Sequence, residues 1–463
     1  MHPPLRALES AEPACFWLDR PERPEPLPSL EGDVDTDLAI VGGGFTGLWA
    51  AVQAKEAAPD RDVVLIEAEA VAEQASGRNG GFVDYSITHG LANGLHHFPD
   101  EIEVLEKLGV ENYRQLLATL DRYGIAAEYE ATGALDVATR PHELDHLREF
   151  HAIREVYHPG ALWLDRDALR AEVDSPTYLG GFWRRENCGM LDPAKLAWGL
   201  RAAALSLGVR IHERTRMESL ARLGAGMLLG CPRGRLRARQ VVLATNAFRS
   251  PVRSMRQRVI PVWDYVLVTE PLSAAQRGAV GWRHRQAIDD SGARFHYYRL
   301  TPDDRILFGG YDAIYHFGSR LEREHQQRPE SHALLARHFF ETFPQLEGIR
   351  FTHRWGGPIA TSTRFTVAVG SAYGRRVAWA VGYTGMGVGT SRFGARAALE
   401  QLAGEGDTVA LRFVRRQPLA WPPEPLRWLG VQITQRALAR VDETGRNGLW
   451  LRLLDKLGVG FDS

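Results

Sequence analysis

Cysteine and long apolar runs are both scarce in this 463-residue sequence. Cys15, Cys188 and Cys231 are too few for a disulfide framework, and no two of them have the spacing of a metal site. No stretch approaches the ~18 apolar residues that a membrane-spanning helix needs, and the first residues lack the apolar core of a signal peptide. We therefore expect a cytoplasmic protein with no metal site and no membrane span.

Net charge is also nearly absent, because 56 basic residues balance 57 acidic ones and leave a net charge of −1. This balance removes the electrostatic basis for non-specific binding to nucleic acid or to an acidic membrane. Lysine occurs only at Lys55, Lys107, Lys195 and Lys456. The sequence is 44% hydrophobic and 24% charged. At this length, such a composition predicts a globular protein of two or three domains.

The composition and periodicity of the chain change along its length and suggest its domains. Residues 1–33 are rich in proline and glutamate and predict an extended arm. A strand at 36–41, a helix at 45–57 and a strand at 63–67 form a βαβ unit of the dinucleotide-binding kind. We expect this domain at 34–90, 185–257 and 365–405, a strand-rich substrate-binding domain at 91–184 and 258–364, and a C-terminal helical extension at 406–463.

A glycine motif joins the first strand of the βαβ unit to its helix. Residues 42–47 read Gly-Gly-Gly-Phe-Thr-Gly and fit G-x-G-x-x-G. Gly42 permits the tight turn, Gly44 lets the backbone approach a pyrophosphate, and Gly47 lets the helix pack close to the strand. Glu67 ends the next strand, where a carboxylate can accept hydrogen bonds from a ribose diol. A structural glycine turn is the alternative, but the complete unit favours dinucleotide binding without choosing between FAD and NAD.

Three further stretches favour flavin. Residues 75–81 form a small, polar, glycine-dense loop whose backbone amides can wrap a diphosphate or a ring system. Residues 240–248 predict a buried strand that ends in small polar residues beside the cofactor crevice. Residues 380–389 predict a buried strand, a glycine-rich turn and a helix whose N-terminus could stabilise the anionic reduced ring. Each stretch alone could be a glycine turn in a sheet, whereas the set favours FAD.

Nine motifs occur in order along the chain: VGGGFTG (41–47), LIEA (65–68), ASGRNGG (75–81), GMLDPAKL (189–196), VVLATNA (241–247), VIPVWDYVLVTEPL (259–272), YYRLTPDDRILFGG (297–310), WGG (355–357) and GYTGMGVG (382–389). In these motifs the sequence resembles the D-amino-acid oxidase/glycine oxidase superfamily of FAD-dependent oxidoreductases, and within it the γ-glutamylputrescine oxidoreductase-like branch. The resemblance covers residues 36–405. It implies an α/β FAD-binding domain of Rossmann-like, glutathione-reductase type assembled from three segments, and an α+β substrate domain with a mainly antiparallel sheet.

The resemblance also implies which residues bind FAD. The glycines of 42–47 would hold the pyrophosphate, Glu67 the adenosine ribose, loop 75–81 the phosphate and flavin, and residues 385–387 the pyrimidine edge of the flavin. In full, the implied residues are Gly42, Gly44, Phe45, Thr46, Gly47, Glu67, Ala68, Ser76, Gly77, Arg78, Asn79, Gly80, Gly81, Met217, Thr245, Asn246, Trp355, Gly357, Gly385, Met386 and Gly387. No cysteine lies at 355–360, where some relatives tether the flavin, so we expect non-covalent FAD.

Two departures from the family pattern bear on the substrate and on the electron acceptor. Glycine-oxidase-like members place an arginine after a W-x-G motif to clamp the substrate carboxylate, but Ile359 stands there in this sequence. This argues against a simple α-amino acid and favours an amine whose acidic group lies farther away. Sarcosine-type oxidases keep a lysine beside the flavin to activate oxygen, and none occurs here between Lys195 and Lys456. The acceptor is therefore O2 or another electron acceptor.

Polar side chains in the strand-rich segments are the candidates for substrate chemistry. We predict catalytic roles for Tyr265, His296, Tyr298 and Arg299. In an alternating strand, His296 and Tyr298 share one face while Tyr297 and Arg299 share the other. Core packing is the alternative for these aromatic side chains.

Together, the motifs and the resemblance predict FAD-dependent oxidation of an amine C–N bond, in a small amine or a γ-glutamylated amine. Hydride would pass to flavin N5, and the resulting imine would hydrolyse to an aldehyde. The reacting amine must be neutral, so the site has to lower its pKa or offer a base. The alternatives are an amino-acid or aminophosphonate oxidoreductase, and a flavoprotein subunit that passes electrons to a partner docked on the 406–463 extension.

Overall fold

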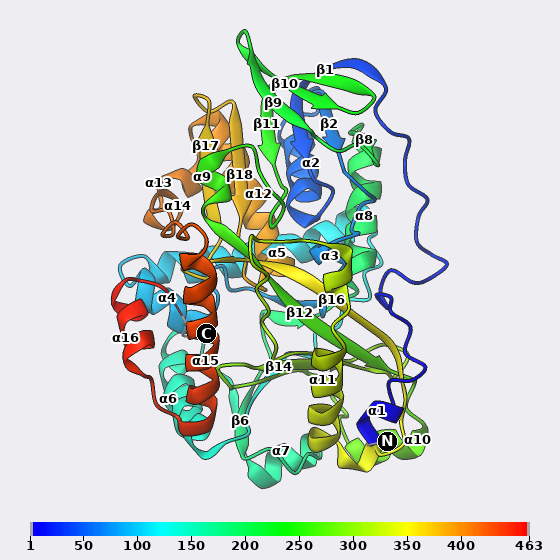
Figure 1. Ribbon diagram of the computed structural model, residues 1–463, viewed down its shortest axis with the longest axis vertical. Coiled ribbons are helices and arrows are strands. Elements are labelled where there is room, and N and C mark those ends of the chain that lie inside the picture. Colours follow the sequence, from blue (N-terminus) through cyan, green and yellow to red (C-terminus); the bar gives the residue numbers. More distant parts are fainter. Residues whose placement is uncertain (1–2, 461–463) are drawn as a thin grey trace.

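A computed structural model describes residues 3–460, in which two large sheets follow one another along the long axis of the molecule (Figure 1). The upper sheet has the order β17-β18-β11-β1-β2-β8, with β10 and β9 added beside β11. Its strands are β1 (Gly32–Val41), β2 (Val63–Ile66), β8 (Arg210–His212), β9 (Ser219–Leu223), β10 (Gly226–Cys231), β11 (Gly234–Leu243), β17 (Ala368–Ala372) and β18 (Val377–Val381). The five strands from β18 to β8 pair in parallel, so three distant segments of the chain build one α/β sheet.

Helices cover one face of the upper sheet, and β9 and β10 cover the other. The helical face carries α2 (Phe45–Ala57), α8 (Pro193–Ser206) and α12 (Gly387–Ala403). Side chains of β1 alternate between the two cores, with Leu38 and Ile40 under the helices. Because the end of β1 is buried on both faces, its last four residues, 38–41, form a continuous apolar run. The strand begins four residues before the predicted 36–41, since its polar first half pairs with the exposed start of β11.

The lower sheet has the order β16-β12-β15-β14-β13-β4-β6-β5. Its strands are β4 (Ala134–Ala138), β5 (Leu162–Asp165), β6 (Gly180–Arg184), β12 (Val259–Thr269), β13 (Ala287–Asp290), β14 (His296–Leu300), β15 (Ile306–Gly310) and β16 (Phe351–Ser362). All neighbouring pairs are antiparallel except β13 and β4, so the expected mainly antiparallel sheet is confirmed. One face packs against α11 (Pro329–Thr342) around a second apolar core.

The remaining elements connect or cover these sheets. A two-stranded sheet pairs β3 (Phe82–Asp84) with β7 (Cys188–Met190). The other helices are α1 (Pro3–Arg6), α3 (Ala75–Arg78), α4 (Leu91–His97), α5 (Ile102–Tyr123), α6 (Pro141–Tyr157), α7 (Arg166–Glu172), α9 (Arg253–Arg256), α10 (Ala274–Val280), α13 (Asp407–Ala410), α14 (Arg412–Arg415), α15 (Leu426–Thr444) and α16 (Leu449–Lys456), with 3-10 turns at Arg323–Gln326 and Pro344–Leu346. No helix among the described residues is long and apolar enough to cross a membrane.

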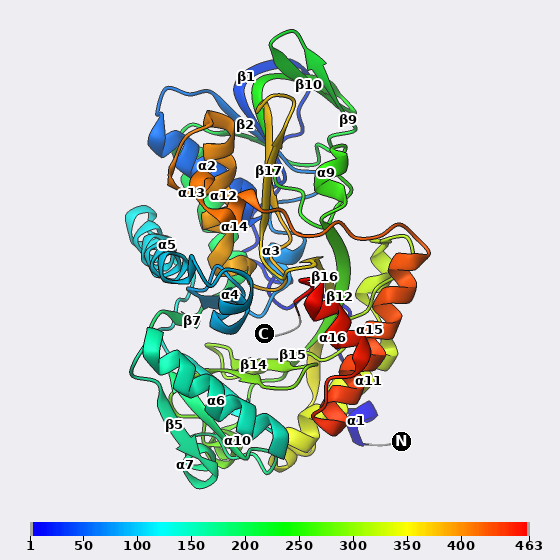
Figure 2. The ribbon, with the colours of Figure 1, turned by 90° about the vertical axis from the view of Figure 1, so that its left-hand side faces the viewer.

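The two ends of the chain pack on opposite sides of this framework. The N-terminal arm, drawn in blue in Figure 1, begins against the lower sheet, where Glu12 bridges to His353, and then rises to the upper sheet. There the backbone N–H groups of Leu27 and Leu30 donate to Glu213 and Thr215. The C-terminal helices α15 and α16 pack against one another at the side of the lower half of the molecule (Figure 1, Figure 2).

Candidate functional site

A cavity of about 1540 Å³ is lined by residues of both sheets. One end, here named the cofactor end, is lined by Gly42, by residues 44–46 of the glycine motif and by residues 67–69. What we call the far end is lined by residues of β4, β13, α6, α15 and α16. Ligand pockets for small molecules are commonly ~300–1,000 Å³, so this cavity has room for a dinucleotide together with a second molecule.

The cofactor end is shaped by glycines that leave no room for a side chain. Gly42 has φ of +115°, and a Cβ there would lie 2.6 Å from the carbonyl oxygen of Ala244. A Cβ on Gly47 would lie 1.9 Å from the carbonyl oxygen of Gly42, so α2 approaches β1 as closely as the motif predicts. Gly44 faces Ser76, whose Oγ accepts the N–H of Phe45 at 2.9 Å. The turn therefore presents the start of α2 to the cavity, which suits a pyrophosphate.

Glu67 lies at the end of β2, beside this turn. Its carboxylate accepts the backbone N–H groups of Gly43 at 2.6 Å and of Glu69 at 2.9 Å. Burial raises the pKa of Glu67, and the two hydrogen bonds oppose that rise. Ala68 and Met217 line the same end, so the predicted ribose and adenine residues lie together.

Loop 75–81 is held from behind by three donors at three successive carbonyls. The indole N–H of Trp355 donates to the carbonyl of Arg78 at 2.9 Å, and that of Trp17 donates to the carbonyl of Asn79 at 2.8 Å. The guanidinium of Arg299 donates to the carbonyl of Gly80 at 3.4 Å. None of these three donors lines the cavity, so the carbonyls are turned into the protein. The loop is thereby fixed with Ser76, Arg78, Asn79 and Gly80 facing the cavity.

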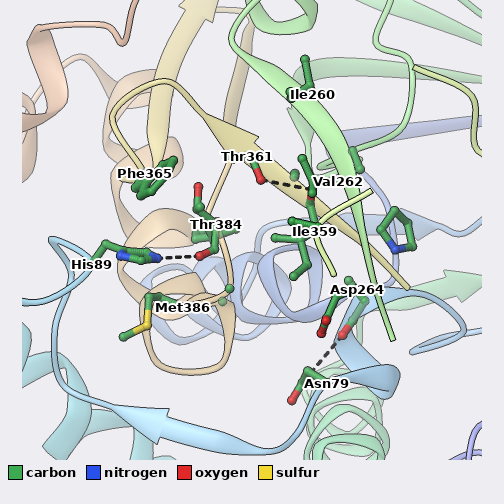
Figure 3. A pocket seen from close by; sticks show the side chains of 18 of the residues that line it. Asn79, His89, Ile260, Val262, Asp264, Ile359, Thr361, Phe365, Thr384 and Met386 are labelled. Atoms are coloured by element: carbon green, nitrogen blue, oxygen red, sulfur yellow. Dashed lines mark hydrogen bonds between the residues drawn. The ribbon is translucent and has the colours of Figure 1, made fainter. Parts of the chain in front are cut away.

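A second glycine-rich turn, at 382–387, lies across the cavity from the substrate sheet. His89 contacts the carbonyl of Thr384 through Nε2 at 2.8 Å, and Asn246 accepts the N–H of Gly382 at 3.0 Å. In Figure 3, His89, Thr384 and Met386 lie on one side of the pocket, while Val262 and Ile359 lie on the other. Gly385, Met386, Gly387, Thr245, Asn246 and Gly357 also line the cavity.

These residues fit a bound FAD. The hydroxyl of Thr245 is buried, lines the cavity and has no hydrogen-bond partner among the described residues, as expected of a group that awaits a ligand. Four of the residues predicted to bind FAD do not line the cavity: Gly47, Gly77, Gly81 and Trp355. Gly77 permits close packing, since a Cβ there would lie 2.3 Å from the carbonyl oxygen of Ala72.

The substrate sheet presents an acid and a phenol to the cavity. Alternate residues of β12, including Val262, Asp264 and Val266, face it. Asp264 accepts the hydroxyl of Tyr297 at 2.6 Å, and burial raises the pKa of Asp264 to about 6. A Cβ on Gly80 would lie 2.9 Å from the ring of Tyr297, so this pair rests directly against loop 75–81.

Three of the predicted catalytic residues lie on the other face of the sheet. Tyr265 donates to the carbonyl of His325, and Tyr298 shares a hydrogen bond with Tyr178, both within the core under α11. His296 contacts Asp290 at 2.6 Å and also lies outside the cavity lining. The predicted alternation holds, but the face that meets the cavity carries Tyr297 instead. The geometry therefore favours Asp264 and Tyr297 as the candidates for substrate chemistry. They replace Tyr265, His296 and Tyr298.

Arg299, the fourth predicted catalytic residue, lies behind loop 75–81. It is fully buried, and desolvation lowers its pKa to about 10. Besides the carbonyl of Gly80, it donates to the carbonyl of Leu191 at 2.7 Å. This contact places Arg299 in support of the loop and outside reach of the cavity.

Carboxylates gather farther along the cavity. Arg184 donates to Asp136 at 2.8 Å and also pairs with Asp84. Asp289 lines the cavity beside them and makes no side-chain hydrogen bond to any residue the structure describes. Burial, with the nearby charge of Asp136, raises the pKa of Asp289 to about 8. This region offers both signs of charge to a bound molecule.

Sequence reasoning missed Asp264 and Asp289, although a signal for each was present. Asp264 is the only charged residue in the largely apolar strand 259–269, and a charged residue in a buried strand calls for an explanation. Asp289 follows Ala287 and Ile288 in the same way. The cavity lining supplied by the C-terminal helices had no comparable signal, because it depends on how distant segments pack.

The sequence profile of the FAD-dependent oxidoreductase family matches residues 37–401. This is most of the chain, so the chain belongs to that family, and FAD is its cofactor. The resemblance to the D-amino-acid oxidase/glycine oxidase superfamily is thereby confirmed.

Two relatives align over most of their length. Gamma-glutamylputrescine oxidoreductase of Escherichia coli (strain K12) is 28% identical over 453 residues, which cover 94% of this chain and 96% of the relative. A probable oxidoreductase, OrdL, of Haemophilus influenzae is 25% identical over 409 residues, covering 86% of this chain and 89% of the relative. The chain is thus an FAD-dependent oxidoreductase similar to these proteins.

Solved structures agree on the fold. Glycine oxidase from Geobacillus kaustophilus superposes with a TM-score of 0.68 at 17% identity, covering 81% of this chain and 96% of that one. Iminodiacetate oxidase from Chelativorans sp. BNC1 also gives a TM-score of 0.68 at 17% identity, with coverages of 82% and 98%. At this identity the likeness establishes the architecture, an FAD-binding α/β domain joined to a substrate domain.

Proposed function

We propose that this chain oxidises a C–N bond of an extended amine with polar groups at its distal end, such as a γ-glutamylated amine. One observation carries the proposal: a single cavity holds the Asp264–Tyr297 pair against loop 75–81 and an unpartnered carboxylate, Asp289, farther along. The name of the E. coli relative, a gamma-glutamylputrescine oxidoreductase, supports this substrate class. FAD, when bound without a covalent link, supplies the acceptor for the hydride that leaves the substrate carbon.

Asp264 is the proposed base. An amine substrate arrives as an ammonium ion, and it must lose a proton before the adjacent C–H bond can release hydride. A carboxylate with a pKa of about 6 is mostly ionised at neutral pH and can accept that proton. Tyr297 donates to Oδ2 of Asp264 and fixes the orientation of the carboxylate beside the loop.

Asp289 and Arg184 are the proposed partners of the distal end of the substrate. A γ-glutamyl group carries one ammonium and one carboxylate. Arg184 offers a positive charge to the carboxylate, and Asp289 offers a carboxyl group whose ionisation a nearby ammonium favours. Near the reacting end, Ile359 faces the cavity where glycine-oxidase-like proteins would place an arginine (Figure 3). A simple α-amino acid would therefore lack its usual carboxylate partner there.

The electron acceptor is proposed to be O2 or another small or protein acceptor. No lysine occurs among the residues that line the described cavity, so oxygen activation by a lysine is not offered. Two cavity-lining side chains are proposed to assist it: Arg78, which lies within loop 75–81, and His89, which contacts the carbonyl of Thr384.

Anaerobic reduction of the bound flavin tests the proposal. The purified holoenzyme is mixed with γ-glutamylputrescine, putrescine or glycine, and loss of the oxidised flavin absorbance is followed by stopped flow. We expect the γ-glutamylated amine to reduce the flavin at least about tenfold faster than glycine, since mismatched polar groups carry large penalties. Reduction by glycine alone would contradict the proposal. Recovery of the absorbance in air would identify O2 as the acceptor, and its absence would identify another acceptor.

A further inference from the structure

The C-terminal extension lies outside the family profile, yet it supplies much of the far end of the cavity. The profile ends at residue 401, whereas the alignment with the E. coli relative covers 94% of this chain. Residues of α15 and α16 line the cavity, among them Val431, Leu438, Val441, Trp450 and Leu451. The extension is therefore part of the candidate site and is not a separate appendage.

Polar contacts hold α15 near its two ends and also at its middle, where the side-chain amide of Gln435 donates to the carbonyl of Ala313. Before its first turn, Glu424 accepts the hydroxyl of Tyr315 at 2.5 Å. In its last turn, Asp442 accepts the N–H of Ala293 and the Nε–H of Arg294, both at 2.8 Å. Asp442 is only 2% exposed and is the one buried residue of α15. The helix is thus attached by a buried carboxylate at the loop that follows β13.

Between these attachments α15 has little core of its own. Leu438 and Val441 face the cavity, while Leu429 and Ile433 on the outer side are 46% and 43% exposed. An element with few buried apolar contacts opens locally at a lower free energy than the whole protein unfolds. Few buried contacts therefore hold the hairpin of α15 and α16 against the cavity.

We propose that residues 421–459 form a movable wall that sorts substrates by length, with Leu438, Val441 and Trp450 in contact with the distal half of the substrate and Asp442 holding the wall closed. The apolar row suits the methylene chain of an extended amine. The identity of the substrate rests on the proposed function above, whereas the closure of the cavity does not.

The first experiment compares Leu438→Ala with Leu429→Ala, which removes the same atoms from the outer side of the same helix. Values of kcat/KM are measured for γ-glutamylated diamines of increasing chain length. One methylene in an apolar pocket is worth about tenfold or more in kcat/KM, so Leu438→Ala should shift the preference toward longer substrates by about tenfold. Leu429→Ala should keep the parent profile. Identical profiles in both variants would overturn the assignment of the wall.

The second experiment needs no substrate. Asp442→Asn weakens the attachment of α15, and Glu443→Gln, a neighbouring exposed position, is the control. Iodide quenching of the bound flavin's fluorescence reports access to the cavity. Loss of a charge-assisted hydrogen bond should raise the open population about tenfold, with no change in the control. Equal quenching in both variants would overturn the closure, whereas increased quenching in an enzyme that no amine reduces would overturn only the proposed function.

Discussion

The two ends of the cavity are built from different parts of the polypeptide. The cofactor end is mostly backbone, with Gly42 and Gly47 in close contact and three loop carbonyls fixed from behind. The far end is made of side chains on β4, β13, α6 and α15, brought together from distant segments. A site made of closely packed backbone has no room for added atoms. A site made of side chains can bind substrates of different charge and length as those side chains are changed. Substitutions at the cofactor end should abolish function, and those at the far end should change which substrate is preferred.

The largest effect is expected at Gly42. Alanine there would adopt φ of +115° and place its Cβ 2.6 Å from the carbonyl oxygen of Ala244. Backbone strain of this kind costs ~1–3 kcal/mol before the clash is counted, so FAD affinity should fall by more than about 100-fold. The measurement is the FAD content of purified Gly42→Ala protein and its affinity in an FAD titration.

Gly430→Ala is the matched control at the far end, because a Cβ there meets nothing within 4 Å. It should retain its full FAD content, and alanine should be neutral or favourable within α15. Retention of FAD by Gly42→Ala, together with the circular dichroism spectrum of the parent, is the opposite result. It would contradict the claim that the cofactor end, unlike the far end, tolerates no added atoms.

The next largest effect is expected for Asp264→Asn, which removes the proposed base. Flavin reduction by the substrate should slow by ~10²-fold, the usual contribution of a general base. In the parent enzyme the rate should fall as pH drops below about 6, because Asp264 then becomes protonated. Stopped-flow reduction across pH tests both points, and a parent profile that is flat through pH 6 would contradict the role of Asp264. Tyr297→Phe should keep the fall in rate at low pH but move it to higher pH. The reason is that the hydrogen bond from Tyr297 lowers the pKa of Asp264.

Asp264→Asn should also stabilise the fold at high pH. The pKa of Asp264 rises from 3.8 to about 6 on folding, chiefly through desolvation. Stability from a raised pKa is complete below the unfolded value and is lost as pH rises through the folded value. Asparagine mimics the neutral acid, so Asp264→Asn should melt about 2–4 °C higher than the parent at pH 8 and show no gain at pH 4. A purely structural Asp264 that stabilised the fold at pH 8 would give the opposite sign.

The same contrast explains which features the sequence reveals. The cradle at 42–47 and the loop at 75–81 are contiguous, and their function depends on glycine, so local spacing alone predicts them. The upper sheet follows from the same motifs because a βαβ unit has few possible arrangements.

The substrate face could not be chosen from the sequence in the same way. Strand β12 is apolar on both faces, so alternation cannot say whether Tyr265 or Asp264 meets the cavity. Only the packing of α11 against the Tyr265 face decides it. The predicted helical extension likewise gave no indication that Leu438 and Trp450 line the cavity, since that depends on the tertiary position of α15.

A moderate effect is expected at the far end for Asp289→Asn. Its unpartnered carboxyl has a pKa of about 8, which an ammonium group nearby would lower. Substrate affinity should therefore strengthen from about pH 7 to about pH 9 as Asp289 ionises. Asp289→Asn should raise KM about tenfold at pH 9 and remove this trend, with little change in kcat. Asp145→Asn, 77% exposed on α6, is the control. An unchanged KM would exclude Asp289 from substrate recognition.

The smallest effect is expected for Trp17→Phe, which tests whether the cofactor end depends on support from the N-terminal arm. Trp17 is 1% exposed, and its indole N–H donates to the carbonyl of Asn79 at 2.8 Å. Phenylalanine keeps most of the packing but leaves that carbonyl without its donor, a loss of about 1 kcal/mol. FAD affinity should fall about fivefold, with no change in substrate preference. Trp428→Phe on the outer side of α15 should leave FAD affinity unaltered. A change in substrate preference in Trp17→Phe would mean that the two ends are coupled through loop 75–81, and the separation between backbone and side-chain sites would then have to be given up.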